Sequence, residues 1–199
     1  MTIEDITLVR KRTPDITYRP PRTRDGASIW RLIGSCEPLD SNSLYCNLLQ
    51  CDHFGDTCVV AERAADAALV GWISAYLLPD EPDTLFVWQV AVDRRVQGMG
   101  VGKRLLWELL QREACESVDR LQTTITADNK ASWALFSSLA RACGGALGHE
   151  PYFRKDAHFD GRHPTEHMVT IDLAAHAAAP DRPWTTARNG AWVRGDDAA

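Results

Sequence analysis

The sequence predicts one α/β domain, a mixed sheet flanked by helices. Its 199 residues, 45% hydrophobic and 25% charged, have ordinary globular composition and suffice for one core of good size. Strand-like and helical segments alternate only in the second half, which argues against a regular doubly wound fold. We expect the domain at 14–173, after a loose N-terminus, 1–13. The composition of the tail, 174–199, predicts that it is largely disordered. Only Trp184 and Trp192 argue against disorder there.

The first half of the chain predicts a short strand, two helices and three strands. Apolar and polar residues alternate over 16–19, and Pro20 and Pro21 end that strand. Asp25 and Ser41 can each cap a helix, because apolar residues follow both at helical spacing. Three candidate strands follow, the last two joined by a proline-rich turn: 57–62, 69–78 and 85–92.

The second half alternates helices with strands. The strand at 85–92 is apolar on both faces apart from Gln89, so we expect it in mid-sheet. A leucine-rich helix is predicted at 100–116, and a second begins at Asp128 and ends at Gly144. Three further strands are predicted: 121–125, 147–153 and 166–173.

Charge and patterning argue against several function classes. The net charge of −5, with both signs mixed, gives no steering toward nucleic acid or an anionic membrane. No apolar run approaches the roughly 18–20 residues of a membrane helix. Glu4 and Asp5 interrupt the only candidate signal segment, so we expect a cytoplasmic protein. The six cysteines form no CxxC pair, and they predict neither a disulfide framework nor a metal site.

The most specific local signal is R-V-Q-G-M-G-V-G at 95–102, between the apolar strand and the leucine-rich helix. Its alternate glycines let the backbone approach a ligand and point N–H groups into one concavity. The start of the helix adds the positive end of its dipole, which suits a pyrophosphate. A tight turn without a ligand is the alternative. A P-loop is disfavoured because no GKS or GKT follows, and GxGxG in mid-chain fits a dinucleotide fingerprint poorly.

The order strand, R-x-x-G-x-G, helix, strand, then D-N-K-A-S-W-A-L-F resembles the acyl-CoA-binding core of the GNAT superfamily of N-acetyltransferases. The resemblance implies a mostly antiparallel central sheet with about four helices, and acetyl-CoA as co-substrate. It also implies that the loop amides hold the CoA pyrophosphate and that the preceding strand lends an amide to the thioester oxygen. The implied CoA contacts are Val90, Ala91, Val92, Arg95, Gln97, Gly98, Gly100, Gly102, Lys103, Asn129 and Phe136.

Four segments resemble one family within the superfamily, the L-2,4-diaminobutyrate N4-acetyltransferases of ectoine biosynthesis. They are L-D-S-N-S-L-Y at 39–45, F-V-W-Q-V-A-V at 86–92, T-I-T-A-D-N-K-A-S-W at 124–133 and T-E-H at 165–167. The resemblance covers roughly 16–173. It implies direct acetyl transfer from acetyl-CoA to a small diamine in a ternary complex, and a homodimer.

A diamine substrate predicts an anionic pocket with a proton acceptor, since only a free amine attacks. The candidate substrate-binding residues are Asp40, Asn42, Tyr45, Trp88 and Glu166. The candidate catalytic residues are Asp40, Trp88, His163 and Glu166.

Each of these residues also has a purely structural interpretation. Asp40 can cap a helix, Trp88 can be core, and Tyr45 can simply pack. Glu166 can be a solvated strand residue, and His163 can lie on a surface loop.

Phe136 stands where many GNAT members carry a tyrosine that protonates the leaving thiolate. Either the thiolate leaves unassisted or another group or a water serves, and the general base stays open. Other functions also keep the glycine loop: an acetyltransferase for another amine, a module that binds acyl-CoA without turnover, and a protein acetyltransferase, which would need an open groove for a peptide. The acidic pair Asp40 and Glu166 argues against the second, because a CoA sensor needs no amine pocket.

Overall fold

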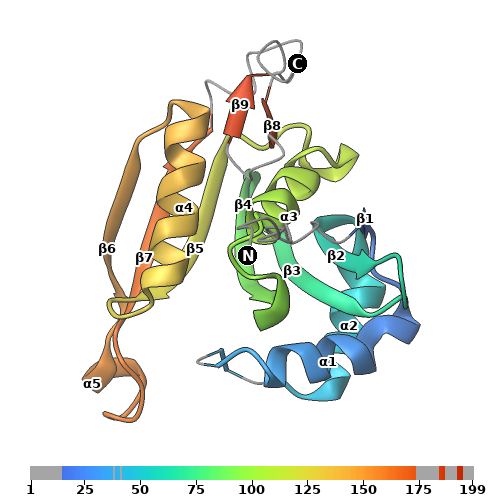
Figure 1. Cartoon of the computed structure of the whole chain (residues 1–199). Coiled ribbons are helices and arrows are strands. Elements are labelled where there is room, and N and C mark those ends of the chain that lie inside the picture. Colours follow the sequence, from blue (N-terminus) through green and yellow to red (C-terminus); the bar gives the residue numbers. More distant parts are fainter. Residues whose placement is uncertain (1–14, 38, 41, 174–183, 187–191, 195–199) are drawn as a thin grey trace, which may run out of the picture.

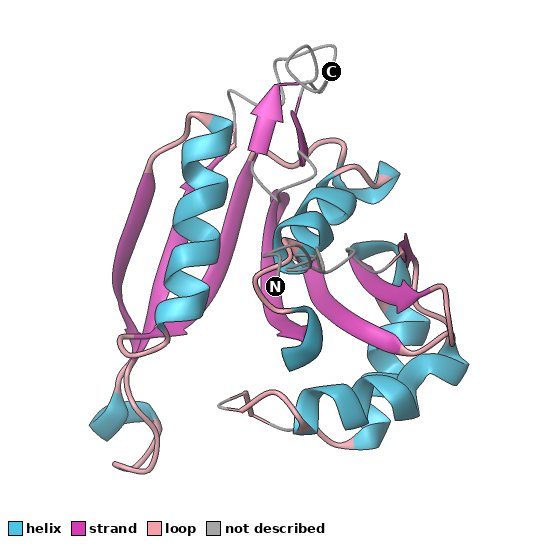
Figure 2. Cartoon of the chain, in the orientation of Figure 1, coloured by secondary structure: helices cyan, strands magenta, loops and turns pink. Residues whose placement is uncertain are grey.

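In the computed structural model the chain forms one seven-stranded mixed sheet with helices on both faces (Figures 1 and 2). The structure describes residues 15–37, 39–40, 42–173, 184–186 and 192–194. The strand order is β1-β2-β3-β4-β5-β7-β6, and all neighbours are antiparallel except β4 and β5. The predicted fold class is therefore confirmed.

The strands and helices follow the periodic spacing of apolar residues in the sequence. The strands are β1 (Ile16–Arg19), β2 (Cys58–Arg63), β3 (Leu69–Leu78), β4 (Glu81–Val92), β5 (Arg120–Thr126), β6 (Leu147–Phe153) and β7 (Glu166–Asp172). The described helices are α1 (Gly26–Gly34), α2 (Leu44–His53), α3 (Val101–Leu110), α4 (Lys130–Cys143) and the short α5 (Lys155–His158). None of the described helices is long and apolar enough to cross a membrane.

Two apolar cores lie on opposite faces of the sheet. The larger joins α3 and α4 to the sheet and includes Leu105, Leu121 and Ile171, all fully buried. The smaller packs α1 against β2, β3 and β4 through Ile29 and Trp72. The helices α1, α3 and α4 thus each bury an apolar face against the sheet, which packs side chains on both of its faces.

The strands β4 and β5 diverge, which opens the sheet where the chain carries its motifs (Figure 1). They pair in parallel only from Thr84↔Arg120 to Phe86↔Gln122. The rest of β4 pairs with β3 alone, so one edge of its backbone faces the opening. The prediction that this strand lies in mid-sheet is confirmed, and the divergence makes half of it an edge.

Several predicted element ends differ from the observed ones. The helix predicted at 100–116 ends at Leu110, and a short 3₁₀ turn, Glu113–Cys115, follows it. The predicted cap Asp128 is one residue early, since Oδ1 of Asn129 accepts the N–H of Ser132 at 3.1 Å. Two adjacent residues with the same capping chemistry cannot be separated by sequence alone.

The N-terminal caps also differ from prediction. The side chain of Ser43 caps α2 by accepting the N–H of Cys46 at 3.1 Å, and the predicted cap Ser41 lies outside the described residues. Asp25 stands at the N-cap of α1, but its carboxylate binds Arg19 at 2.7 Å instead of the helix amides.

The termini were predicted to be unstructured. Residues 1–13 and most of the tail lie outside the described residues. Within the tail, β8 (Trp184–Thr186) and β9 (Trp192–Arg194) pair as a two-stranded antiparallel sheet. These strands contain the tryptophans that argued against disorder.

Candidate active site

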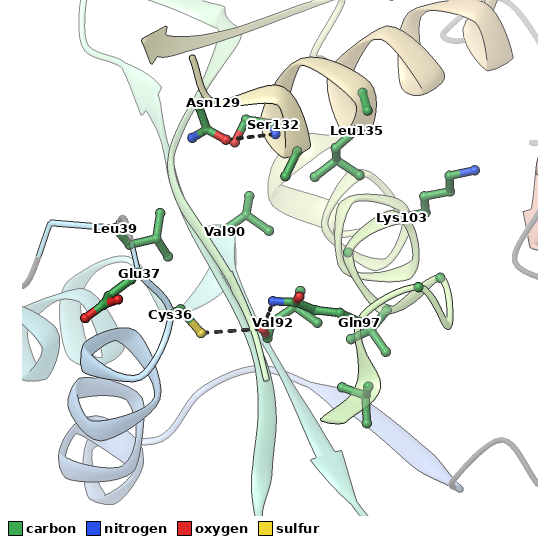
Figure 3. A pocket seen from close by; sticks show the side chains of 17 residues that line it. Cys36, Glu37, Leu39, Val90, Val92, Gln97, Lys103, Asn129, Ser132 and Leu135 are labelled. Atoms are coloured by element: carbon green, nitrogen blue, oxygen red, sulfur yellow. Dashed lines mark hydrogen bonds between the residues drawn. The ribbon is translucent and has the colours of Figure 1, made fainter. Parts of the chain in front are cut away.

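A cavity of about 620 Å³ opens between the end of β4, the start of α3 and the start of α4. In Figure 3, Cys36, Glu37 and Leu39 lie on one side of β4, and Lys103 and Leu135 lie on the other. Residues from the glycine loop, β4 and α4 that were predicted to contact CoA line this cavity together: Val90, Val92, Gln97, Gly98, Gly100, Gly102, Lys103 and Asn129.

The glycine loop has the backbone geometry of an anion site. Gly98 and Gly100 have φ of 75° and 82°, values that only glycine adopts easily. Gly100 is the N-cap of α3, and no side chain caps that helix end. Within the described part of the chain, no side chain caps the first-turn N–H groups of α3 at the cavity, and Lys103 adds a positive charge beside them. The residues present fit a bound pyrophosphate.

Three of the predicted CoA contacts take other positions. The guanidinium of Arg95 is held by Asp93, with Nε–Oδ1 at 2.9 Å and Nη2–Oδ2 at 2.7 Å, and it does not line the cavity. The side chain of Ala91 packs in the smaller core, which leaves only its backbone for CoA. Phe136 is buried and lines the neighbouring cavity instead.

A second cavity of about 390 Å³ continues from the first. The two share Leu39, Val90, Asn129 and Ser132 in their linings. The second cavity brings together most of the residues predicted for the substrate and the chemistry, although they are far apart in sequence: Asp40, Asn42, Trp88, His163 and Glu166. Tyr45 does not line it; that side chain is 69% exposed on α2, so the predicted substrate contact is not seen.

His163 lies between two carboxylates in the second cavity. Its Nε2 is 3.4 Å from Oδ2 of Asp40 and 3.9 Å from Oε1 of Glu166. Its Nδ1 is 2.8 Å from the carbonyl oxygen of Pro164. A carbonyl only accepts, so Nδ1 carries the hydrogen and Nε2 of the neutral ring keeps its lone pair. That lone pair can accept a proton inside the cavity.

Glu166 is half-buried in the same cavity and is not a solvated strand residue. Its Oε2 is buried and has no hydrogen-bond partner among the described residues. Burial raises the pKa of the Glu166 carboxyl above its usual value, while nearby His163 and a hydrogen bond from Thr124 act in the opposite direction. A cation bound at Oε2 would supply the missing partner and favour the ionised form.

Trp88 lines the cavity from β4 and is 47% exposed, so it is not a core residue. It occupies a β-bulge: Gln89 pairs with Ser74 and Val87 with Ala75, and no β3 residue stands opposite Trp88. Bulges re-aim side chains at sites of this kind.

Among the described residues, no group of three His, Cys, Asp or Glu side chains is placed to hold a metal ion.

The comparisons with known proteins agree with this geometry. The family model of the acetyltransferase (GNAT) family matches residues 27–140. The L-2,4-diaminobutyric acid acetyltransferase of Methylotuvimicrobium alcaliphilum is 46% identical over 79% of this chain and 91% of its own length. The chain belongs to the GNAT acetyltransferases, in the family of L-2,4-diaminobutyric acid acetyltransferases. The resemblance seen in the sequence is confirmed.

Two further relatives of this acetyltransferase support the assignment. The L-2,4-diaminobutyric acid acetyltransferase of Vibrio parahaemolyticus is 47% identical over 78% of this chain and 85% of its own length. Among solved structures, the diaminobutyrate acetyltransferase of Paenibacillus lautus matches with a TM-score of 0.77 and 36% identity. The match covers 81% of this chain and 96% of that one, and that structure contains L-2,4-diaminobutyric acid and coenzyme A.

Sequence reasoning missed several residues of this acetyltransferase site. Cys36 and Glu37 line the larger cavity, yet nothing in their pattern signals a ligand. The hydrogen bond from Thr124 to Glu166 depends on a contact between β5 and β7. Gln89 did carry a signal, because it interrupts an otherwise apolar strand.

Proposed function

We propose that this acetyltransferase moves the acetyl group of acetyl-CoA to the N4 amine of L-2,4-diaminobutyrate. The product, N4-acetyl-L-2,4-diaminobutyrate, would serve ectoine biosynthesis. One observation carries the proposal: the glycine-lined cavity and the cavity with Asp40, His163 and Glu166 meet at Val90, Asn129 and Ser132. The names of the relatives support the same substrate.

Acetyl-CoA would enter through the larger cavity. The N-terminal amides of α3 and the amine of Lys103 would hold its pyrophosphate. The pantetheine arm would lie along the free edge of β4 at 90–92, where the divergence from β5 leaves the backbone without a strand partner on that side. The acetyl group would then reach the junction of the two cavities.

The diamine would bind in the smaller cavity, where its positive charges meet two carboxylates. The buried Oε2 of Glu166 would accept a hydrogen from an ammonium group, and Asp40 would bind the substrate from the opposite side of His163. Trp88 would cover the aliphatic chain with its exposed face. Two anionic groups select a diamine over a monoamine, because a monoamine leaves one carboxylate unpaired.

His163 would take the proton that the reacting ammonium must lose. Its Nε2 carries the lone pair, and the imidazolium that forms would lie between the carboxylates of Asp40 and Glu166. The free amine would attack the thioester carbon, and a backbone N–H of β4 would stabilise the oxyanion. Collapse would break the C–S bond and release CoA as the thiolate, and the second proton of the attacking nitrogen would pass to the thiolate or to water as the neutral amide forms. Phe136 has no proton to donate, so the thiolate would leave unassisted.

We infer a homodimer in the cytoplasm. The edge strand β6 exposes both faces, with Tyr152 and Phe153 at 47% and 40% exposure, and a second copy would cover this edge. All six cysteines are free thiols, which suits a reducing compartment.

The test is a product analysis. Purified enzyme, acetyl-CoA and L-2,4-diaminobutyrate should release thiol in equimolar amount to a monoacetylated product, and two-dimensional NMR should place the acetyl group on N4. Acetylation at N2 would overturn the proposed orientation of the diamine in the smaller cavity. Measurable CoA binding without release with any amine would indicate an acyl-CoA-binding module instead.

A further inference from the structure

Gln89 is a buried amide in an apolar strand. It lines the second cavity together with its neighbours Trp88 and Val90, yet it is only 8% exposed. Burying an amide without partners costs about 1–3 kcal/mol, so such a residue is expected to make specific hydrogen bonds.

The bulge at Trp88 determines which way Gln89 faces. Without a bulge, Val87, Gln89 and Ala91 would share one face of β4. Instead Val87 packs in the larger core and Ala91 in the smaller one. The extra residue therefore turns Gln89 toward the α1 side of the sheet, where the loop between α1 and α2 passes.

The amide of Gln89 binds this loop at two points. Its Nε2 donates to the backbone carbonyl of Asp40 at 2.8 Å, and its Oε1 accepts from Nδ2 of Asn42 at 3.2 Å. The carbonyl only accepts, so the orientation of the Gln89 amide is fixed, and that in turn fixes the amide of Asn42. Oδ1 of Asn42 is left able to accept a hydrogen.

The bond to Asp40 uses its backbone and leaves its side chain available. The carboxylate of Asp40 is 84% exposed, and its one described ion pair is the 3.4 Å contact with His163. An exposed side chain on a loop has many accessible positions, and ordering it on binding costs affinity. Anchoring the loop through the carbonyl of Asp40 and the side chain of Asn42 reduces that cost.

We propose that Gln89 is a positioning residue, which holds the loop of Asp40 and Asn42 over the diamine cavity and so raises affinity for the diamine without affecting CoA. The proposal rests on the proposed function. The side-chain amide of Gln89 is engaged by Asp40 and Asn42, so its role is exerted through Asp40.

The test compares Gln89→Met with Gln50→Met. Gln50 is the second buried glutamine on this side of the sheet and bonds Asn47 at 2.9 Å within α2, away from the loop. Gln89→Met should raise KM for diaminobutyrate about tenfold and leave KM for acetyl-CoA within about twofold. Gln50→Met should lower the melting temperature without changing either KM. An unchanged KM for the diamine in Gln89→Met would overturn the proposal.

A double-mutant cycle separates positioning from general support. Asp40→Ala removes the carboxylate and keeps the carbonyl that Gln89 binds. If Gln89 acts through Asp40, adding Gln89→Met to Asp40→Ala should change KM for the diamine by less than about twofold. A further tenfold rise would show an independent role and refute the positioning argument.

A measurement on the unaltered protein covers the case in which the variant does not fold. By NMR, the Gln89 side-chain amide proton that binds the Asp40 carbonyl should exchange with water at least about tenfold more slowly than those of exposed Gln111. Equally fast exchange would overturn the contact. This result stands even if the unaltered enzyme acetylates no diamine, an outcome that would refute only the proposed function.

Discussion

Replacing Glu166 by glutamine should weaken substrate binding and stabilise the fold at the same time. A charge-assisted hydrogen bond contributes about 1.5–3 kcal/mol, so Glu166→Gln should raise KM for diaminobutyrate about 10–150-fold. KM for acetyl-CoA should stay within about twofold, because Glu166 lines only the smaller cavity. The carboxylate with a buried, unpartnered oxygen is an electrostatic cost to the free enzyme.

The stability effect has a defined pH dependence. Burial raises the pKa of Glu166 in the folded state, so the folded protein binds this proton more tightly than the unfolded chain. The free energy of unfolding therefore falls as pH rises from the ordinary value of 4.5 through the raised one. Glutamine does not titrate, so the variant should melt about 2–4 °C higher at pH 7.5 for each ~1 kcal/mol relieved. The gain should vanish below about pH 4.

The assay pairs steady-state kinetics with thermal unfolding across pH. Glu116→Gln, at an exposed glutamate directly after the 3₁₀ turn that follows α3, is the matched control and should change neither quantity. A Glu166→Gln enzyme with normal KM for the diamine, or with a stability gain independent of pH, would refute the reasoning.

Three other substitutions test separate parts of the molecule. Gly100→Val places a β-branched residue at φ 82° and should weaken CoA binding at least about tenfold by calorimetry, and unchanged affinity would remove the loop from the CoA site. His163→Gln should lower kcat about 100-fold with KM for the diamine within about threefold, and a normal kcat would exclude His163 as proton acceptor. Arg19→Met leaves the partly buried carboxylates of Asp25 and Glu62 without their cation and should cost about 2–3 kcal/mol in urea unfolding, whereas a loss below about 0.5 kcal/mol would contradict this role.

Local periodicity was sufficient to predict the elements of the sheet. The predicted strand at 69–78 matches β3, and 147–153 matches β6. Alternating side chains report which residues face a core, and this information is contained in neighbouring positions. Helix ends were harder to predict from the sequence. Asp128 and Asn129 are equally good caps, and helix-like spacing of residues continues through the 3₁₀ turn at Cys115 although α3 has already ended.

The glycine loop could be proposed as an anion site because its residues are contiguous in the sequence. Gly98, Gly100 and Gly102 lie within five residues and line one cavity, and they would bind a ligand through the backbone. The predicted CoA contact of Arg95 is not seen, because Asp93, two residues earlier, binds its guanidinium. The sequence does not show whether an arginine binds the phosphate of a ligand or a carboxylate of the same chain.

The proposed amine site could be suggested from the sequence only through resemblance. Asp40 meets His163 and Glu166 across more than half of the chain, and no local pattern encodes that contact. The bulge at Trp88 was also hidden, since tryptophan and glutamine are compatible with either face of a strand. It exposes Trp88 to the cavity and turns Gln89 beneath the loop.

The most direct test of the account is kcat/KM for acetyl transfer with a panel of amines, measured by thiol release from acetyl-CoA. The value for L-2,4-diaminobutyrate should exceed those for ornithine, lysine and spermidine at least about 100-fold, and Asp40→Ala and Glu166→Gln should reduce this preference. Equal rates with all four amines, or a preference that survives both substitutions, would contradict the claim that the two carboxylates select the diamine.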